Sequence, residues 1–343
     1  MVIVGMFFLD AMTYAMDVQF SYAQRQDLTV TFTEPASARS FHEIASVDGV
    51  MAVEPLRAVP VRLRLGSRSR QTSITGVIDD AGLNRVIDSK LRVLDLPPDG
   101  IVLSAKMAEI LGAKAGDRLE LDILEGARPR PEVIVAAVAE EFLGAAAYMD
   151  LDSLHRLMRE DRVLSGAYLQ VDESMLDEIY TRLKGIPAVA GVALKRSVID
   201  SFRKTVEQNM SVMIFFNQLF SNIIAFGVIY NAVRISLSER SWELASLRVM
   251  GFTRGEISRI LLGEFAVLVA IAIPLGLVIG YGLAGLTVAT VGDTELYRIP
   301  LVVNDATFGA AAITVLAAAF VSGLVVRRRL NRLDLVAVLK TRE

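Results

Sequence analysis

The chain has 343 residues, a formal net charge of −3, no cysteine and only two histidines, His42 and His155. The negative charge argues against a nucleic-acid-binding protein, and the lack of cysteine excludes disulfides, zinc–thiolate sites and iron–sulfur clusters. Hydrophobic residues make up 53% of the chain and its mean hydropathy is +0.45, which is typical of a protein with membrane spans.

The N-terminus is an apolar run, residues 1–9 (MVIVGMFFL), which is too short to cross a bilayer because a spanning helix needs about 20 residues. It lacks the basic region and the cleavage site of a signal peptide. We interpret residues 1–18 as the remnant of a first transmembrane helix whose beginning is missing. The alternative is a short segment at the membrane interface.

Residues 19–209 contain patterns of both strands and helices. Asp27–Thr33 and Ala58–Leu65 alternate apolar and polar residues, as half-buried strands do, whereas Ala36–Ala45 and Met175–Leu183 show helical spacing. The run 100–123 predicts a strand, a helix, a glycine turn and a strand, and residues 167–194 predict a similar series. We therefore expect a large α+β domain in this part of the chain.

No motif in residues 19–209 predicts catalysis. The glycines of Gly112–Gly116 (GAKAG) lack the Gly-Lys-Ser/Thr ending of a phosphate-binding loop and predict only a turn between strands. No nucleophile motif is present and no spacing singles out a pair of carboxylates. We expect no catalytic, cofactor or metal site, and no enzyme activity.

Three later stretches are long and apolar enough to span a membrane, at about residues 211–235, 265–287 and 306–326. Arginines are frequent between the first two spans and after the third, which places both of these segments in the cytoplasm. It follows that residues 19–209 are extracytoplasmic. The predicted fold is an α+β membrane protein, in which three full transmembrane helices and the remnant of a first one form a bundle. The large extracytoplasmic domain is inserted after helix one.

Two stripes of residues predict close helix packing. One is polar and lies in the first full span; the other consists of small residues four apart in the second span, which also contains Pro274. Either stripe can meet a helix of the same chain or of another subunit. The residues are Asn217, Gln218, Ser221, Asn222, Gly276, Gly280 and Ala284.

The segment 238–264 predicts two short helices between the first two full spans. The first would end at Gly251, since a glycine often terminates a helix. Thr253 and Glu256 form the pattern of a capping box for a second helix that starts at about Arg254, and Phe252 and Ile257 are spaced as a hydrophobic staple. The spacing alone leaves two interpretations open, a projecting knob that binds a partner or a plain interfacial loop.

This segment resembles the FtsX/MacB-type ABC transporter permeases, whose members carry a pattern close to Glu-Arg-x-x-Glu-(Ile/Leu)-x-x-Leu-Arg-x-x-Gly between their second and third helices. The resemblance extends over essentially the whole chain, including the run 100–123 and the C-terminal tail. It departs from the family at Leu335, where members often have proline, and at Ala245, where they often have glycine. The chain is similar to the second permease unit of long members, so a first unit would be missing or encoded separately.

The resemblance implies that segment 238–264 docks on a separate cytoplasmic ABC ATPase and passes its motion across the inner membrane to the extracytoplasmic domain. Trp242 and Leu247 are the expected apolar anchors. Other implied partners are a second permease unit, membrane lipid and a periplasmic adaptor, but no nucleic acid. The implied docking residues are Glu239, Arg240, Trp242, Glu243, Leu244, Leu247, Arg248, Gly251 and Phe252.

Two functions remain open. One is a permease subunit that exports or extracts a lipid, a lipoprotein or another amphipathic substrate. The other is a non-transporting signalling subunit that regulates an extracytoplasmic hydrolase. A neighbouring gene for a cell-wall hydrolase would favour signalling, whereas one for a periplasmic adaptor or an outer-membrane channel would favour transport.

Overall fold

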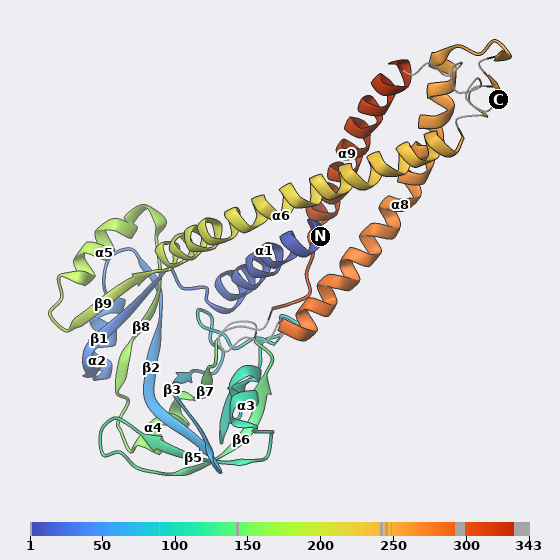
Figure 1. The fold of residues 1–343 in the computed structure, drawn as a ribbon. Helices are drawn as coiled ribbons and strands as arrows, with labels where there is room; N and C mark the ends of the chain where they lie inside the picture. Colours follow the sequence, from blue (N-terminus) through green and yellow to red (C-terminus); the bar gives the residue numbers. More distant parts are fainter. Residues whose placement is uncertain are drawn as a thin grey trace. The chain divides into compact units, whose positions relative to one another are not determined.

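The computed structural model describes residues 2–88, 90–141, 144–240, 243, 246–247, 249–291 and 299–332. The chain forms two compact units, one of long helices and one of mixed α and β structure (Figure 1). The helical unit comprises Met1–Ala11, Val206–Thr290 and Leu301–Glu343. The α+β unit comprises Met12–Thr205 and Val291–Pro300.

In the described residues, the α+β unit is built on one sheet of nine strands. The long strand β2 (Val50–Leu65) takes part in two separate groups of paired strands. Its first half pairs with β8 and its second half with β3 and β5. The remaining elements, in chain order, are β1 (Leu28–Ala36), α2 (Ala38–Ala45), β3 (Arg68–Val77), β4 (Ile101–Ser104), α3 (Ala105–Leu111), β5 (Arg118–Ile123), β6 (Glu132–Ala139), β7 (Ala147–Asp150), α4 (Leu151–Met158), β8 (Leu164–Val171), α5 (Leu176–Lys184) and β9 (Val189–Leu194).

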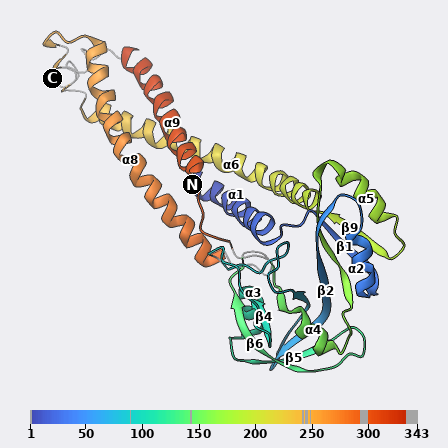
Figure 2. The ribbon, with the colours of Figure 1, turned by 180° about the vertical axis from the view of Figure 1, so that it is seen from behind.

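Six of the strands close into a small barrel, which we call the barrel lobe. The order β2-β3-β7-β4-β6-β5 returns to β2, with parallel pairing at β3–β7 and β4–β6 and antiparallel pairing elsewhere. Its interior is filled by fully buried residues such as Leu63, Ile74 and Leu103, and helices α3 and α4 pack on it (Figure 2). A closed barrel has no free edge on these strands.

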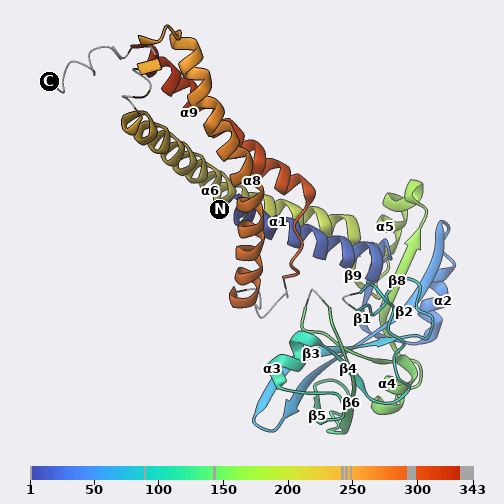
Figure 3. The same ribbon diagram turned by 90° about the vertical axis from the view of Figure 1, so that its right-hand side faces the viewer.

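The other strands form an antiparallel sheet in the order β2-β8-β1-β9, which we call the sheet lobe. Helices α2 and α5 share its core, since Ile44 of α2 and Ile179 of α5 are buried with Leu28 and Leu169 (Figure 3). The strand predicted at Asp27–Thr33, the helix predicted at Ala36–Ala45 and the series predicted over residues 167–194 are present here, and the strand predicted at Ala58–Leu65 is the barrel half of β2. The sequence did not predict β3, β6, β7 or α4.

Local sequence signals determine where helix α3 of the barrel lobe begins and ends. The hydroxyl of Ser104 accepts a hydrogen bond from the amide of Met107 at 3.2 Å and so caps α3. Gly112 ends the same helix with a φ of +70°. The predicted series of strand, helix, glycine turn and strand over residues 100–123 is therefore confirmed.

The helical unit contains α8 (Arg254–Val291), α9 (Asp305–Arg332), the first part of α1 (Val2–Asp17) and the part of α6 (Lys195–Glu239) from Val206 onward. Among the described residues, four helical stretches are long and apolar enough to cross a membrane, namely Val2–Ala23, Lys195–Ser236, Gly255–Thr290 and Asp305–Val325. The chain is therefore an α+β membrane protein.

Two helices differ from expectation. The first helix continues past the apolar run, through Asp10 and Asp17 and into a π-helical turn at Val18–Ala23, and reaches spanning length. The apolar run of residues 1–9 therefore belongs to a longer helix, because the two acidic residues interrupt the hydropathy without breaking the helix. That residues 1–18 are the remnant of a first transmembrane helix stays a prediction. The span expected at about residues 211–235 starts further upstream, because it is part of one continuous helix, α6, that begins at Lys195.

Candidate coupling site

Segment 238–264 joins α6 to α8. Of its predicted docking residues, Glu239, Arg240 and Glu243 are exposed, whereas Leu247 is half-buried. Gly251 and Phe252 form the turn that precedes α8. Trp242, Leu244 and Arg248 lie outside the described residues. The roles of all nine docking residues stay predictions.

The turn at Gly251 terminates a helix by backbone hydrogen bonds. The amide of Phe252 donates to the carbonyl of Leu247 at 3.2 Å, across Gly251, whose φ is +99°. This six-to-one hydrogen bond around a left-handed residue is the Schellman arrangement. Because L-residues with a side chain rarely adopt this φ, glycine suits the position, and the predicted helix end at Gly251 is confirmed.

The turn leads directly into a capping box at the start of α8. The amide of Glu256 donates to the hydroxyl of Thr253 at 3.3 Å, and the carboxylate of Glu256 accepts from the amide of Thr253 at 2.8 Å. Each residue thus satisfies a backbone donor that the helix leaves unpaired. Ile257 is fully buried, as its place in the predicted staple requires. The capping box is confirmed.

An ion pair links the two arms of the segment. The Arg240 guanidinium lies 2.6 Å from the Glu264 carboxylate, which is 24 residues further along the chain on α8. Both side chains are exposed, so the pair contributes little to stability. It does orient the start of the segment relative to α8.

The most exposed apolar side chains of the turn are Val249 and Met250, at 70% and 67%. The sequence did not single out Met250, although a methionine next to a helix-ending glycine is an available signal. Large apolar side chains that face outward on a rigid turn suit a protein interface, and methionine adapts to irregular partner surfaces. The structure therefore adds two candidate contacts to those predicted.

Helix α1 contacts α6, α8 and α9 of this unit. Gly280 of α8 lies so close to Ile3 that an added Cβ would come within 2.7 Å of its side chain, and Asn217 of α6 lies against Gly5. Ala284 is fully buried, whereas Gly276 faces open space. Gly280 and Asn217 thus make contacts within the chain.

The polar stripe of α6 also reaches α9. Gln218 donates from Nε2 to the Thr314 hydroxyl at 2.6 Å, and Ser221 is buried nearby on the same helix. Asn222 donates to the carbonyl of Gln218 in its own helix. A bond between side chains of two apolar helices fixes their rotation, because neither group has water as an alternative partner.

Asp10 of α1 caps α9, a contact that the sequence did not predict. Its Oδ2 accepts from the amide of Asn304 at 3.0 Å and from the hydroxyl of Thr307 at 2.6 Å. A carboxylate is favourable at the positive end of a helix dipole. The available signal was an ionisable residue inside an apolar helix, which by itself indicates a specific partner.

In the α+β unit, Glu54 of β2 anchors the long connection between β3 and β4, residues 78–100. Its carboxylate accepts from three successive backbone amides, those of Gly82, Leu83 and Asn84. The carbonyl of Leu83 in turn accepts from the amide of Arg25, just after the first helix, at 2.7 Å. The connection therefore ties the end of that helix to the barrel lobe.

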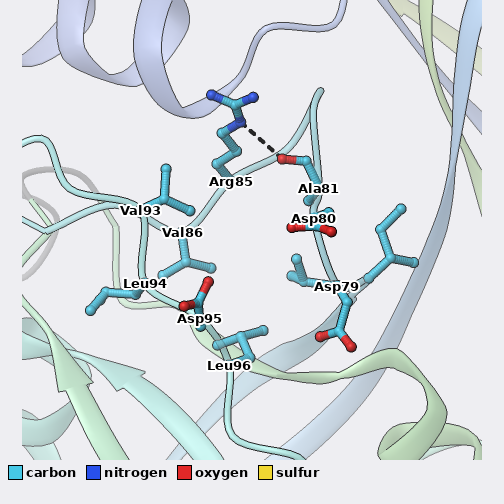
Figure 4. Close-up of a pocket in the computed structure, with 11 residues that line it drawn as sticks. Asp79, Asp80, Ala81, Arg85, Val86, Val93, Leu94, Asp95 and Leu96 are labelled. Carbon is cyan, nitrogen blue, oxygen red and sulfur yellow. Dashed lines mark hydrogen bonds between the residues drawn. The ribbon is translucent and has the colours of Figure 1, made fainter.

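A hollow of about 320 Å³ lies in the same connection, with Val86 in its lining and Asp79, Asp80 and Asp95 exposed at its rim (Figure 4). Arg85 donates from Nε to the carbonyl of Ala81 at 2.9 Å. In the described part of the chain, no group of three or more histidine, aspartate or glutamate side chains is placed to hold a metal ion.

Burial shifts several pKa values in the α+β unit. It raises the pKa of Tyr168 to about 12, and the nearby charge of Glu54 acts in the same direction. Burial also raises the pKa of Glu141 to about 7, although the Tyr148 hydroxyl donates to its carboxylate at 3.2 Å and so opposes the shift. Glu141 therefore titrates near neutral pH.

Comparisons with known proteins relate the chain to membrane transporters. Residues 216–335 match the model of the FtsX-like permease C-terminal family. An uncharacterized ABC transporter permease protein of Mycobacterium tuberculosis is 27% identical over 325 residues, which cover 85% of this chain and 37% of the relative. The chain thus spans little more than a third of that relative's length.

Two solved structures show partial likeness. The extracellular domain of the noncanonic ABC-type transporter YknZ from Gram-positive bacteria is 17% identical, with a TM-score of 0.30, and the match covers 45% of this chain and 88% of that one. The periplasmic region of MacB from Actinobacillus actinomycetemcomitans is 8% identical, with a TM-score of 0.35, covering 53% and 95%.

The family model spans most of the helical unit and includes the whole of segment 238–264 with its coupling pattern. Residues 216–335 are thus similar to the C-terminal part of FtsX-like permeases, and most of the chain is similar to part of an ABC transporter permease protein.

Proposed function

We propose that this permease carries ATPase-driven motion across the inner membrane and applies it to its extracytoplasmic α+β domain, in order to export or extract a lipid, a lipoprotein or another amphipathic molecule. A separate cytoplasmic ABC ATPase docks on segment 238–264. The observation that carries the proposal is the turn at Gly251. It is rigid by its own hydrogen bonds and yet presents apolar side chains outward.

A transmitting element has to be stiff where the force enters. The Schellman bond on one side of the turn and the capping box on the other fix its backbone, and the buried Ile257 side chain anchors the start of α8. The turn leads directly into α8, which runs for 38 residues, so a displacement of the turn acts at the end of a long helix. This supports mechanical transmission at segment 238–264.

The test is co-purification of the permease from its own host, with and without Met250→Asp. An exposed methionine can be exchanged without disturbing the fold, but an aspartate buried unpaired in an interface costs several kcal/mol. We expect an ABC ATPase to accompany the wild-type chain and to be lost from Met250→Asp and from Leu247→Asp.

Met51→Asp is the matched control, because Met51 of β2 is a methionine of similar exposure, 64%, in the α+β domain. It should retain the ATPase. If the Met250 and Leu247 variants both keep full ATPase association, segment 238–264 is not the docking site. If no ABC ATPase accompanies the wild-type chain, the proposal as a whole is wrong.

A further inference from the structure

The helical unit contains an apolar groove of about 630 Å³ between α8 and α9, with Ile229 of α6 at its side. Helix α8 lines it from Leu262 to Ile273 and α9 from Leu316 to Arg327. Both helices contribute residues at positions i, i+3, i+4, i+7, i+8 and i+11, which keeps one face of each helix toward the groove. The groove is therefore formed by one continuous face of α8 and one continuous face of α9.

The shape follows from residue size. Small residues such as Ala270, Ala319 and Gly323 alternate with bulky ones such as Phe265 and Phe320, so the hollow has a low floor and aromatic walls. Eleven residues of helix correspond to about 16 Å, so this is the length of the groove. The hydrocarbon core of a bilayer is about 30 Å thick, so the groove matches one leaflet.

One end of the groove is basic. Arg327 closes the α9 stripe and is its only charged member. On the neighbouring helix, Leu262 lies within contact distance of a Cβ added at Gly323, so the two stripes run antiparallel and Leu262 is at the Arg327 end. Arg259 lies one turn beyond Leu262 and is exposed. Within the described residues, Arg327 forms no ion pair with an acidic side chain.

We propose that this groove binds one acyl chain of an anionic phospholipid, whose phosphate meets Arg327. An apolar slot that is one leaflet long and ends in a guanidinium complements a phospholipid in both parts of that molecule. A helix from another subunit would need a groove across the whole hydrocarbon core and would leave Arg327 without a counter-charge. The site requires only that the helices lie in a membrane.

The experiment uses the full chain in phosphatidylcholine nanodiscs, with fluorescence quenching by brominated lipids. The chain has a single tryptophan, so Trp242→Phe removes the background and Phe320→Trp places a reporter in the groove. We expect brominated phosphatidylglycerol at low mole fraction to quench this reporter about fivefold more effectively than brominated phosphatidylcholine, as one basic residue near anionic lipid allows. Leu324→Trp serves as a second reporter in case the first variant does not fold.

Matched variants separate a bound lipid from general contact with the bilayer. Leu268→Trp lies on α8 at a similar height, is 54% exposed and does not line the groove, so both lipids should quench it equally. Arg327→Gln should abolish the preference at the groove reporter, and Arg327→Lys should largely keep it. Ala319→Leu, which fills the floor, should reduce quenching by both lipids.

Three results would overturn the proposal: equal quenching of the groove reporter by the two lipids, a preference that survives Arg327→Gln, or no quenching by either lipid. The last result would mean that another protein segment occupies the groove. The readout does not involve ATP hydrolysis or transport. The lipid site can therefore fail while the coupling function stands, and the reverse also holds.

Discussion

Apolar side chains are placed oppositely in the two units of this chain. In the barrel lobe, Leu63, Ile74 and Leu103 are fully buried, whereas on the long helices Phe215, Ile271 and Val278 are largely exposed. The barrel lobe must remove its apolar surface from water by folding on itself. The helices satisfy their backbone internally and can present apolar side chains to lipid.

Charged side chains also differ between the two units, because an ion pair is buried in the α+β unit and another is exposed in the helical unit. Arg57 of β2 is fully buried, with its guanidinium 3.1 Å from Glu125 and 2.8 Å from Glu160, and it donates to the Ser165 hydroxyl at 3.0 Å. The Arg240–Glu264 pair of the helical unit is exposed on both sides. A buried charge thus requires partners on several sides, whereas an exposed charge is solvated by water and gains little from its partner.

The largest expected effect is that of Arg57→Ala. Arg57 lies where β2 passes from the sheet lobe to the barrel lobe, and its loss leaves two carboxylates facing each other without a counter-charge. We expect the free energy of unfolding of residues 19–209, expressed alone, to fall by about 3 kcal/mol. Urea unfolding, read as a single cooperative transition, gives this value.

Arg62→Ala is the control on the same strand. Arg62 is exposed and lies 3.9 Å from Asp122, so its removal should cost less than about 1 kcal/mol. Equal losses for the two variants would contradict the contrast between buried and exposed charge. A segment 19–209 that shows no folded spectrum would remove the premise that this part folds by itself.

An intermediate effect is expected from pH at Glu141. The pKa of this carboxyl is about 7 in the folded chain, against an ordinary value of 4.5. The folded state therefore holds the proton more tightly, and stability that is present below pH 4.5 is lost as the pH rises toward 7. In thermal unfolding, Glu141→Gln should reduce the decline in melting temperature between pH 5 and pH 7.5.

Tyr148→Phe sharpens the same measurement. The Tyr148 hydroxyl lowers the pKa of Glu141 by donating to its charged form, so its removal should move the decline to higher pH. If Glu141→Gln declines with pH as steeply as the wild type, burial of this carboxyl does not govern the stability of the α+β unit in this range.

Sequence patterns predicted the elements that rest on local chemistry. The glycine end at Gly251, the Thr253–Glu256 box and the series over residues 100–123 each depend on residues that are close in the chain. The three full spans follow from composition alone. The family pattern around Glu239 and Arg248 identified segment 238–264 as the candidate docking segment, although several residues of the pattern lie outside the described part of the chain.

What the sequence could not predict depends on contacts between distant residues. The partner of Asp10 lies almost 300 residues away, and Glu54 binds amides about 30 residues further on. Closure of the barrel depends on β2 pairing with both β3 and β5, which no periodicity specifies. The groove between α8 and α9 arises only when two stripes of ordinary residues meet.

The smallest expected effect is that of Thr253→Ala, at the turn before α8, where local hydrogen bonds act together with the buried Ile257 side chain. The variant loses the hydroxyl that accepts from the Glu256 amide, but its backbone amide can still donate to the Glu256 carboxylate. Loss of such a cap costs about 1 kcal/mol, so the first-turn amides of α8 should exchange about fivefold faster with deuterium, as mass spectrometry of peptides covering residues 254–258 would show. Thr287→Ala is the control, because that hydroxyl only bonds the carbonyl of Leu283 within the same helix. If exchange at residues 254–258 is unchanged in Thr253→Ala, the turn is held by packing, as the barrel lobe is, and the contrast between the two units does not extend to the coupling segment.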